Sequence, residues 1–516
     1  MSMTDPEEDP NRAPEADFEA PTILDRGRHR ISRRDFDPDC LKVLYRLNAH
    51  GFTAYLVGGA VRDLMLGRRP ADFDVGTNAH PNQIKKLFRN AFLIGRRFRL
   101  AHVRFQGGKI IEVATFRRKP DEEELAAERE EEAARAAEAA REDEDRAAAV
   151  AAQRAEDAAE PLEEEPLEAG ADEPGPMETT PIEPVPIEPE NPETPAADAG
   201  PLPECAAPAA GQRRGRLPLK PIAYGTPRED AFRRDLTINA LFYDIATYSV
   251  IDYVGGLDDL EAGRIRIIGD PDASYTEDPV RIWRVLRHAS RLGFSIEEKT
   301  AEAIPRHSHR LGICSGSRLF EELNKDMKSG SVRAFFQAAR THGILPRVLG
   351  NVGEIYQASD NAFERLTFLL SALDASIGSG GAPPPEVMYG LLLWPWAEPL
   401  LAAIQGDKPK VLYDAFRGSH ATATVPKTLL LETVHTLAIV EHMLRSLEDG
   451  KMRWALKERP HYPEASRIAS LLVEGTFGTC DDPFSVIFRN RFGTPPRSRP
   501  HKHRRRKKTV PPPPPA

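Results

Sequence analysis

Apolar and polar positions follow two successive regimes along this chain. Up to about residue 275, short apolar runs of strand length, such as TAYLVGG (53–59) and KIIEVATF (109–116), alternate with stretches of helical spacing such as DPDCLKVLYRLNAHG (37–51). Gly107 and Gly108, between two such runs, predict a hairpin turn. Beyond residue 275 the periodicity is helical nearly to the end. We therefore predict an α/β head, a mixed sheet with helices, followed by an all-α neck and body.

Three segments lack the apolar periodicity that a folded core requires. They are an acidic start (1–30), an Ala, Glu and Pro-rich stretch (121–220) and a basic end (486–516). Such compositions bury too little apolar surface to offset chain entropy, so we expect a disordered start, a long insertion tolerated in a surface loop, and a disordered tail. The folded parts are then the head (31–120 and 221–272), the helical neck (273–335) and the helical body (336–485).

The net charge is unevenly distributed. The whole chain carries −9, but residues 121–200 alone hold 28 acidic residues against five arginines, which leaves the remainder at +14. A basic remainder favours a polyanion such as nucleic acid as partner.

The four cysteines lie far apart, which argues against a disulfide framework or a zinc site. The N-terminus is acidic where a targeting peptide would be apolar or basic, and no apolar run approaches the ~20 residues that span a membrane. We expect a cytoplasmic protein without a membrane partner.

The stretch LGRRPADFDVGTN (66–78) places Asp72 and Asp74 on either side of Phe73. In an extended segment the two aspartates share one face. Two carboxylates side by side repel each other, and a divalent cation such as Mg²⁺ relieves that repulsion. An isolated pair of this kind is more often a solvated turn, so the neighbouring residues must decide.

A glycine turn precedes the two aspartates. In LVGGAVRD (56–63) a strand ends at Gly58 and Gly59 and a helix begins, followed by Arg62 and Asp63. Glycines let the backbone approach a ligand, and the amides at a helix start favour an anionic phosphate, which Arg62 would help neutralise. Followed so soon by the two aspartates, the turn predicts a phosphate site rather than plain turn chemistry.

These stretches resemble the polymerase-beta-type nucleotidyltransferases, in the branch shared by bacterial poly(A) polymerases and tRNA CCA-adding enzymes. The resemblance continues through RRDLTINAL (233–241), DYVGGLDDLEAGRIRIIGDP (252–271) and EDPVRIWRVLRHASRLGF (277–294), and covers roughly residues 30–118 and 222–330. It implies a nucleotidyltransferase head, ATP as substrate, a two-metal Mg²⁺ site and template-independent addition of nucleotides to RNA 3′ ends. Two metal ions held by carboxylates suit that phosphoryl transfer.

Asp72 and Asp74 are the predicted catalytic metal ligands, and the third essential acid has two candidates. Glu112 is an acid within an otherwise apolar strand and would complete the metal site. Asp235 is placed beside the nucleotide by the resemblance, as are Asp278 and Arg281 against the base edge. The predicted nucleotide-binding residues are Gly58, Gly59, Arg62, Asp63, Arg233, Arg234, Asp235, Asn239, Asp278, Arg281 and Arg284.

RNA contacts are expected from three basic stretches. FLIGRRFRLAHVRF (92–105) is similar to bacterial poly(A) polymerases rather than CCA-adding enzymes, one face of the helix at 277–294 is arginine-rich, and ten Lys or Arg without an acid fall between 489 and 508. The predicted RNA-binding residues are Arg96, Arg97, Arg99, Arg287, Arg291, Arg504, Arg505, Arg506, Lys507 and Lys508.

The sequence therefore predicts an enzyme, most simply a monomer, that adds AMP from ATP to single-stranded RNA 3′ ends and releases pyrophosphate. A CCA-adding or A-adding tRNA nucleotidyltransferase is the alternative within the family. A catalytically silent RNA-binding scaffold is the alternative from another class, although it would have no reason to keep acids beside an anionic ligand.

Overall fold

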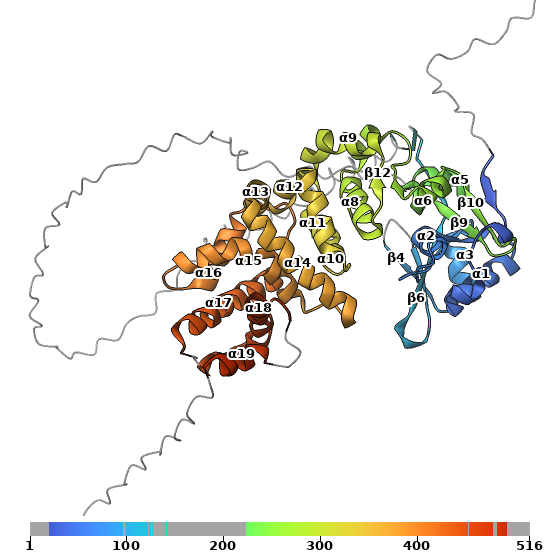
Figure 1. Cartoon of the computed structure of the whole chain (residues 1–516). Helices are drawn as coiled ribbons and strands as arrows, with labels where there is room; N and C mark the ends of the chain where they lie inside the picture. The colour runs from blue at the N-terminus through green and yellow to red at the C-terminus, as the bar shows by residue number, and fades with distance from the viewer. Residues whose placement is uncertain are drawn as a thin grey trace, which may run out of the picture. The chain divides into compact units, whose positions relative to one another are not determined.

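The computed structural model describes residues 20–95, 100–121, 123–124, 126, 141, 223–451, 454–477 and 482–492. Within these ranges the first part of the chain builds a sheet with flanking helices, and the part from α9 onward is helical (Figure 1). The predicted α/β head followed by an all-α part is thereby confirmed. No helix of the described residues is both long and apolar enough to cross a membrane.

A mixed sheet forms the centre of the head. Its eight strands within the described residues are mostly antiparallel, and β3 with β6 is the parallel pair. The GG step at 107–108 joins β5 to β6 as the predicted hairpin. In sheet order the strands are β1 (Thr22–Leu24), β10 (Ser249–Asp252), β9 (Leu241–Asp244), β2 (Ala54–Val57), β3 (Asp74–Thr77), β6 (Ile110–Thr115), β5 (Leu100–Arg104) and β4 (Ala91–Ile94).

Helix α1 (Pro38–Ala49) shows how the sequence builds these elements. The side chain of Asp37 accepts the backbone N–H of Asp39 at 2.8 Å, and Pro38 occupies the first helical position, so both start signals coincide. The apolar face buries Val43, Leu44 and Leu47 against the sheet. The other helices of the head are α2 (Gly59–Met65), α3 (Pro81–Leu87), α5 (Pro227–Phe232) and α6 (Gly256–Glu261).

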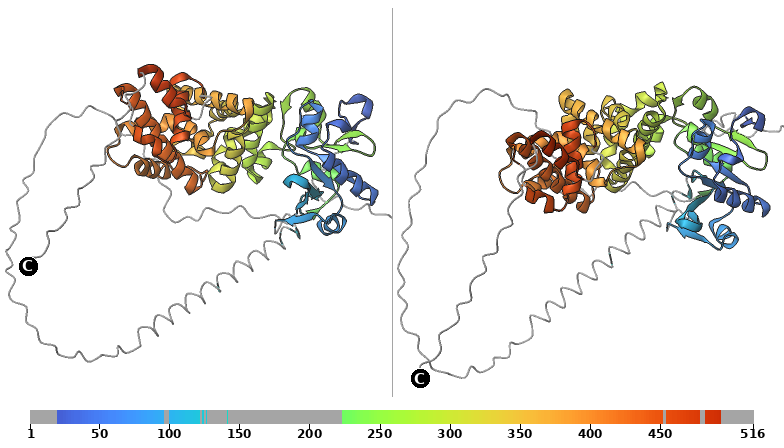
Figure 2. Two further views of the ribbon diagram at one scale, coloured as in Figure 1. Left: turned by 90° about the horizontal axis from the view of Figure 1, so that it is seen from below. Right: turned by 60° about the horizontal axis from the view of Figure 1, so that its bottom comes forward.

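The neck and body are helical, and Figure 2 shows their helices stacked side by side in two views. Most are amphipathic, whereas α15 is buried along most of its length, which explains its almost uniformly apolar sequence. The helices are α7 (Pro271–Glu277), α8 (Val280–Leu292), α9 (Glu298–His307), α10 (Gly316–Met327), α11 (Val332–Thr341), α12 (Leu345–Leu349), α13 (Asn351–Ala358), α14 (Asp360–Gly380), α15 (Pro385–Ala403), α16 (Lys408–Arg417), α17 (Lys427–Asp449), α18 (Tyr462–Glu474) and α19 (Pro483–Phe492).

Two predicted boundaries are wrong. Residues 1–30 were expected to be disordered, but β1 pairs with β10 at the edge of the sheet through its backbone, which needs no apolar periodicity. The disordered tail was expected from residue 486, but α19 continues to Phe492 and buries Ile487 and Phe488. The basic run that follows Arg489 hid this apolar face in the sequence.

The insertion leaves and rejoins the head at one point. Strand β7 (Arg117–Arg118) pairs antiparallel with β8 (Ala223–Tyr224), so the two ends are held together by backbone hydrogen bonds.

Deleting residues 121–215 and joining the ends with a short glycine-serine linker should leave a folded protein. The β7–β8 pair already fixes the ends of the insertion, so the linker has only a short span to close. A thermal melt of the deletion variant should give a midpoint within a few degrees of the parent. Loss of a cooperative transition would show that the segment contributes to the core.

Candidate functional site

The parallel pairing of β3 with β6 brings two predicted acids to neighbouring positions. Val75 pairs with Val113, and one residue earlier on each strand stand Asp74 and Glu112. The side chain of Asp74 is exposed to solvent. Its pKa is nevertheless raised to about 6, first because the surrounding protein desolvates the carboxyl group and then because of the negative charges of Glu112 and Asp72. The three acids therefore repel one another electrostatically. Glu112 also lies 3.4 Å from the Nε2 atom of His102.

The glycine turn next to this cluster has the expected backbone. Gly58 has φ +72°, and a Cβ there would lie 3.1 Å from a guanidinium nitrogen of Arg234. Arg62, on the following helix α2, is buried, and its Nε donates to the carboxylate of Asp63 at 2.8 Å. Its Nη1 donates to the side-chain oxygen of Asn239 at 2.5 Å. Arg62 thus fixes Asn239 within the folded head, a function that the sequence did not suggest.

An acid that sequence reasoning missed, Asp230, holds both arginines of the RRD stretch. Its buried carboxylate accepts from Nε of Arg233 at 3.0 Å and from Nε and Nη2 of Arg234 at 3.0 and 2.9 Å. Arg234 also donates to the backbone carbonyl of Asn239 at 3.1 Å. Its positive charge partly offsets the increase in the pKa of Asp74. The spacing of three and four residues from Asp230, typical of helical ion pairs, is the signal that could have found it.

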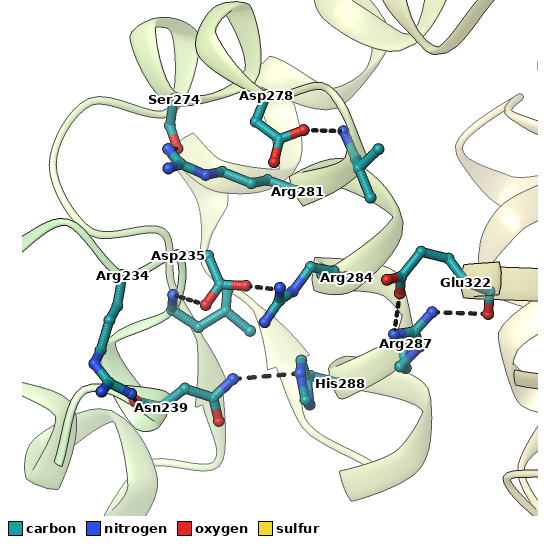
Figure 3. Close-up of polar contacts among 12 residues, drawn as sticks. Arg234, Asp235, Asn239, Ser274, Asp278, Arg281, Arg284, Arg287, His288 and Glu322 are labelled. Carbon is teal, nitrogen blue, oxygen red and sulfur yellow. Dashed lines mark hydrogen bonds and ion pairs between the residues drawn. The ribbon is translucent and has the colours of Figure 1, made fainter. Parts of the chain in front are cut away.

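The two candidates for the third acid occupy different surroundings. Glu112 joins Asp72 and Asp74, whereas the buried carboxylate of Asp235 pairs with Nε of Arg284 on α8 at 2.6 Å (Figure 3). Burial alone would raise the pKa of Asp235, but the cation of Arg284 and the backbone N–H of Leu236 hold it below its ordinary value. Asp235 therefore lies in the contact between head and neck.

His288 was not singled out from the sequence, yet it lies at the centre of this contact. Its Nε2 is 3.3 Å from the side-chain nitrogen of Asn239, and Figure 3 shows the two side chains facing each other. Burial, then the cation of Arg62, lowers the pKa of His288 well below its ordinary value, so the ring is neutral and Nε2 accepts from Asn239.

The two residues expected at the base edge each have another partner. Asp278 accepts the backbone N–H of Val280 at 3.2 Å and pairs with Arg318 at 2.6 Å. Arg281 donates to the hydroxyl of Ser274 at 2.7 Å. The structure brings both residues to the start of α8 (Figure 3) but does not pair them with each other.

The expectation that Arg287 binds RNA does not fit its surroundings. Its side chain is only 12% exposed, and its Nε and Nη2 donate to the carboxylate of Asp326 on α10 at 2.7 and 3.0 Å. A further contact joins it to Glu322. A guanidinium so engaged holds α8 to α10, while Arg291, one turn later, is exposed. The other predicted RNA contacts, Arg96, Arg97, Arg99, Arg504, Arg505, Arg506, Lys507 and Lys508, lie outside the described residues.

No group of three or more His, Cys, Asp or Glu side chains in the described part of the chain is arranged to hold a metal ion. The acids of β3 and β6 nevertheless form the kind of donor set that a hard divalent cation prefers, and their mutual repulsion is what such an ion relieves.

Replacing Arg287 by Met should destabilise the protein by about 3–5 kcal/mol, because it leaves the buried carboxylate of Asp326 without its cation, while Glu322 keeps only Lys325. The matched substitution Arg291→Met, at an exposed position of the same helix, should change the free energy of unfolding by less than about 0.5 kcal/mol. Urea denaturation of both variants measures the difference. Equal, small effects would return Arg287 to the residues available for RNA.

The family model described as "Poly A polymerase head domain" matches residues 54–159 and 204–266, and the model described as "Probable RNA and SrmB- binding site of polymerase A" matches residues 293–352. A poly(A) polymerase I from Salmonella typhimurium is 34% identical over 464 residues, which cover 88% of this chain and 82% of that protein.

Relatives on the other branch are more distant. A CCA-adding enzyme from Bacillus pumilus is 28% identical over 289 residues, which cover 56% of this chain and 49% of that protein. The solved structure of the Bacillus stearothermophilus CCA-adding enzyme in complex with CTP superposes with a TM-score of 0.52 at 18% identity, over 89% of this chain and 83% of that one. The latter likeness shows a shared fold.

Proposed function

The chain belongs to the bacterial poly(A) polymerase family and is a nucleotidyltransferase, and from this premise we propose that it is a template-independent enzyme that extends RNA 3′ ends with AMP from ATP in the cytoplasm. The observation that carries the proposal is the similarity to poly(A) polymerase I, which extends over 82% of that protein, while the CCA-adding relative is matched over about half of its length. The pyrophosphate of ATP is released at each addition.

We assign the catalytic residues from the geometry of the head. Asp72, Asp74 and Glu112 would hold Mg²⁺, since the negative charges of Asp72 and Glu112 both act on Asp74 at the edge of β3 and β6. Bound there, the ions would neutralise phosphate charge and activate the 3′-hydroxyl. Asp235 then serves to orient Arg284 rather than to bind metal.

The nucleotide would lie against the contact between head and neck. Arg234 is held by Asp230 beside Asp74, where its charge suits the triphosphate. Asn239 is fixed from two sides, by Arg62 on its side-chain oxygen and by His288 on its side-chain nitrogen. A preorganised polar group of this kind orients a substrate without a reorganisation cost at the moment of reaction.

Substrate choice separates the two branches of the family. Purified protein would be offered an unstructured RNA and a tRNA lacking its CCA end, each with the four nucleoside triphosphates separately. Long extension of the unstructured RNA with ATP alone is expected. Incorporation of CTP restricted to tRNA ends would move the protein to the CCA-adding branch, and no incorporation with either RNA would favour a silent scaffold.

The variants Asp72→Asn and Asp74→Asn should lower kcat by about 10³-fold, because metal stabilisation of the transferring phosphate is worth several kcal/mol and each 1.36 kcal/mol is tenfold. RNA affinity should stay within about twofold of the parent. The matched control is Asp258→Asn, an exposed acid of α6, which should retain full activity. Both are measured by ATP-dependent RNA extension, and retention of a tenth of parental turnover in both variants would rule out the assignment.

Truncation after Phe492 should make RNA binding less sensitive to salt. It keeps α19 whole and removes eight Lys and Arg residues. The logarithm of affinity for a single strand changes with the logarithm of salt by about −0.7 for each phosphate neutralised, so the slope should become shallower. Binding of a single-stranded RNA at several salt concentrations tests this, with a tail of equal length carrying Gln in place of Lys and Arg as control. An unchanged slope would show that the tail does not engage RNA.

A further inference from the structure

A pocket of about 580 Å³ lies in the head between the segment that leads into α1 and the turn that joins α2 to β3. Four arginines line it, Arg30, Arg34, Arg68 and Arg69, and all four are exposed. Phe36 and Phe73 give it an aromatic wall, with ring centroids 6.1 Å apart. We call this the arginine pocket. Its size suits a single nucleotide unit, since ligand pockets span about 300–1,000 Å³.

The charges of the arginine pocket are not balanced from within. Among the described residues, no hydrogen bond or ion pair involves the guanidinium group of any of its four arginines. The two acids of its lining are engaged elsewhere: Asp35 accepts the backbone N–H of Ser32, and Asp37 accepts that of Asp39 and pairs with Lys109. Four clustered cations without partners favour an anionic ligand, above all a phosphate.

The guanidinium group of Arg30 packs against the turn at Gly67, which lines the pocket. Gly67 has φ +70°, and a Cβ at this position would lie 2.5 Å from the guanidinium carbon of Arg30. Only glycine lets that guanidinium lie so close to the turn, so a side chain at residue 67 would displace it.

The location of the arginine pocket indicates which substrate would supply the phosphate. The arginine pocket shares none of its lining with the Arg62, Arg234, Asn239 and Arg284 contacts that we assign to the incoming nucleotide. Phe73, however, stands between Asp72 and Asp74, one peptide unit of about 3.8 Å from each. A phosphate bound in the pocket therefore belongs to a second substrate whose reacting end meets the same carboxylates.

Resting on the function proposed above, we propose that the arginine pocket binds the RNA substrate close to its 3′ end. The arginines contact backbone phosphate, and a base lies against Phe73, the combination by which proteins grip single-stranded RNA without reading its sequence. The pocket thus holds the strand in register with the acids while the nucleotide site is refilled.

The test compares two double variants of equal charge. Arg30→Ala with Arg34→Ala empties one side of the pocket, and Lys85→Ala with Arg89→Ala removes two exposed cations, on and just after α3, that do not line the pocket. Binding of a labelled oligo(A) RNA without ATP, and KM values for RNA and for ATP, are measured for both and for the parent. Thermal melts check that both variants fold. We expect that they do, because all four side chains are exposed.

The pocket variant should bind oligo(A) at least tenfold more weakly with a shallower salt slope, raise KM for RNA in parallel and leave KM for ATP within about twofold. Gly67→Ala should weaken RNA binding in the same direction by displacing Arg30. The control pair should change RNA affinity less than threefold.

Two outcomes would overturn the inference. An increase in KM for ATP or in the inhibition constant of pyrophosphate, with RNA affinity unchanged, would assign the pocket to the nucleotide. Equal loss of RNA affinity in the pocket and control variants would show that the effect depends only on the net charge of the protein and not on the pocket. Because RNA binding is measured without ATP, the result is independent of whether the parent polymerises ATP, so failure of the proposed function is read separately from the extension assay.

Discussion

The register between β3 and β6 is the constraint on which the candidate site depends. Val75 and Val113 are fully buried, and their burial fixes the pairing of the two parallel strands. One residue earlier, the same pairing places Asp74 beside Glu112, and desolvation by the surrounding protein, followed by this neighbouring charge, raises the pKa of Asp74. A slip of one residue would move every side chain of the strand to the other face, so apolar burial maintains a crowding of charge that the acids alone would relieve by separating.

Helix α8 connects this sheet to the helical part by presenting a different arginine to each neighbour. Arg281 contacts α7, Arg284 contacts Asp235 of the head, and Arg287 contacts α10. The spacing of three residues turns the side chains progressively around the helix, so what resembles one basic stripe in the sequence is a set of separate ion pairs. The contact between head and neck thereby depends on the packing of a single helix.

Much of the fold was accessible from the sequence because period and turn chemistry are local signals. The α1 helix, the Gly58 turn, the β5–β6 hairpin and the helical second half all follow from spacing and turn residues. Strand β1 and the end of α19 did not, since one forms by edge pairing and the other mixes apolar and basic residues.

Within the site, sequence reasoning named Arg62 and Asn239 but not their contacts, because the contact of Asn239 with His288 spans 49 positions and that of Arg62 with Asn239 spans 177. Neither contact leaves a local pattern. Sequence separation also explains why Asp235 and Glu112 cannot be distinguished as the third acid from the sequence. In the fold, Asp235 lies beside Arg284 and Glu112 lies beside Asp74.

The state of pairing separates the arginines of this protein into two groups. Burial of a cation is costly unless a carboxylate or amide oxygen meets it, and Arg62, Arg234 and Arg287 all satisfy that condition. Such side chains are held in one geometry and shape the site. Within the described residues, the guanidinium groups of the arginine pocket contact no acid, so their mutual repulsion destabilises the folded head, although only slightly because they are exposed. A polyanion that enters the pocket relieves this repulsion and gains four donors at once, so the unpaired arginines should supply affinity while the paired ones supply position.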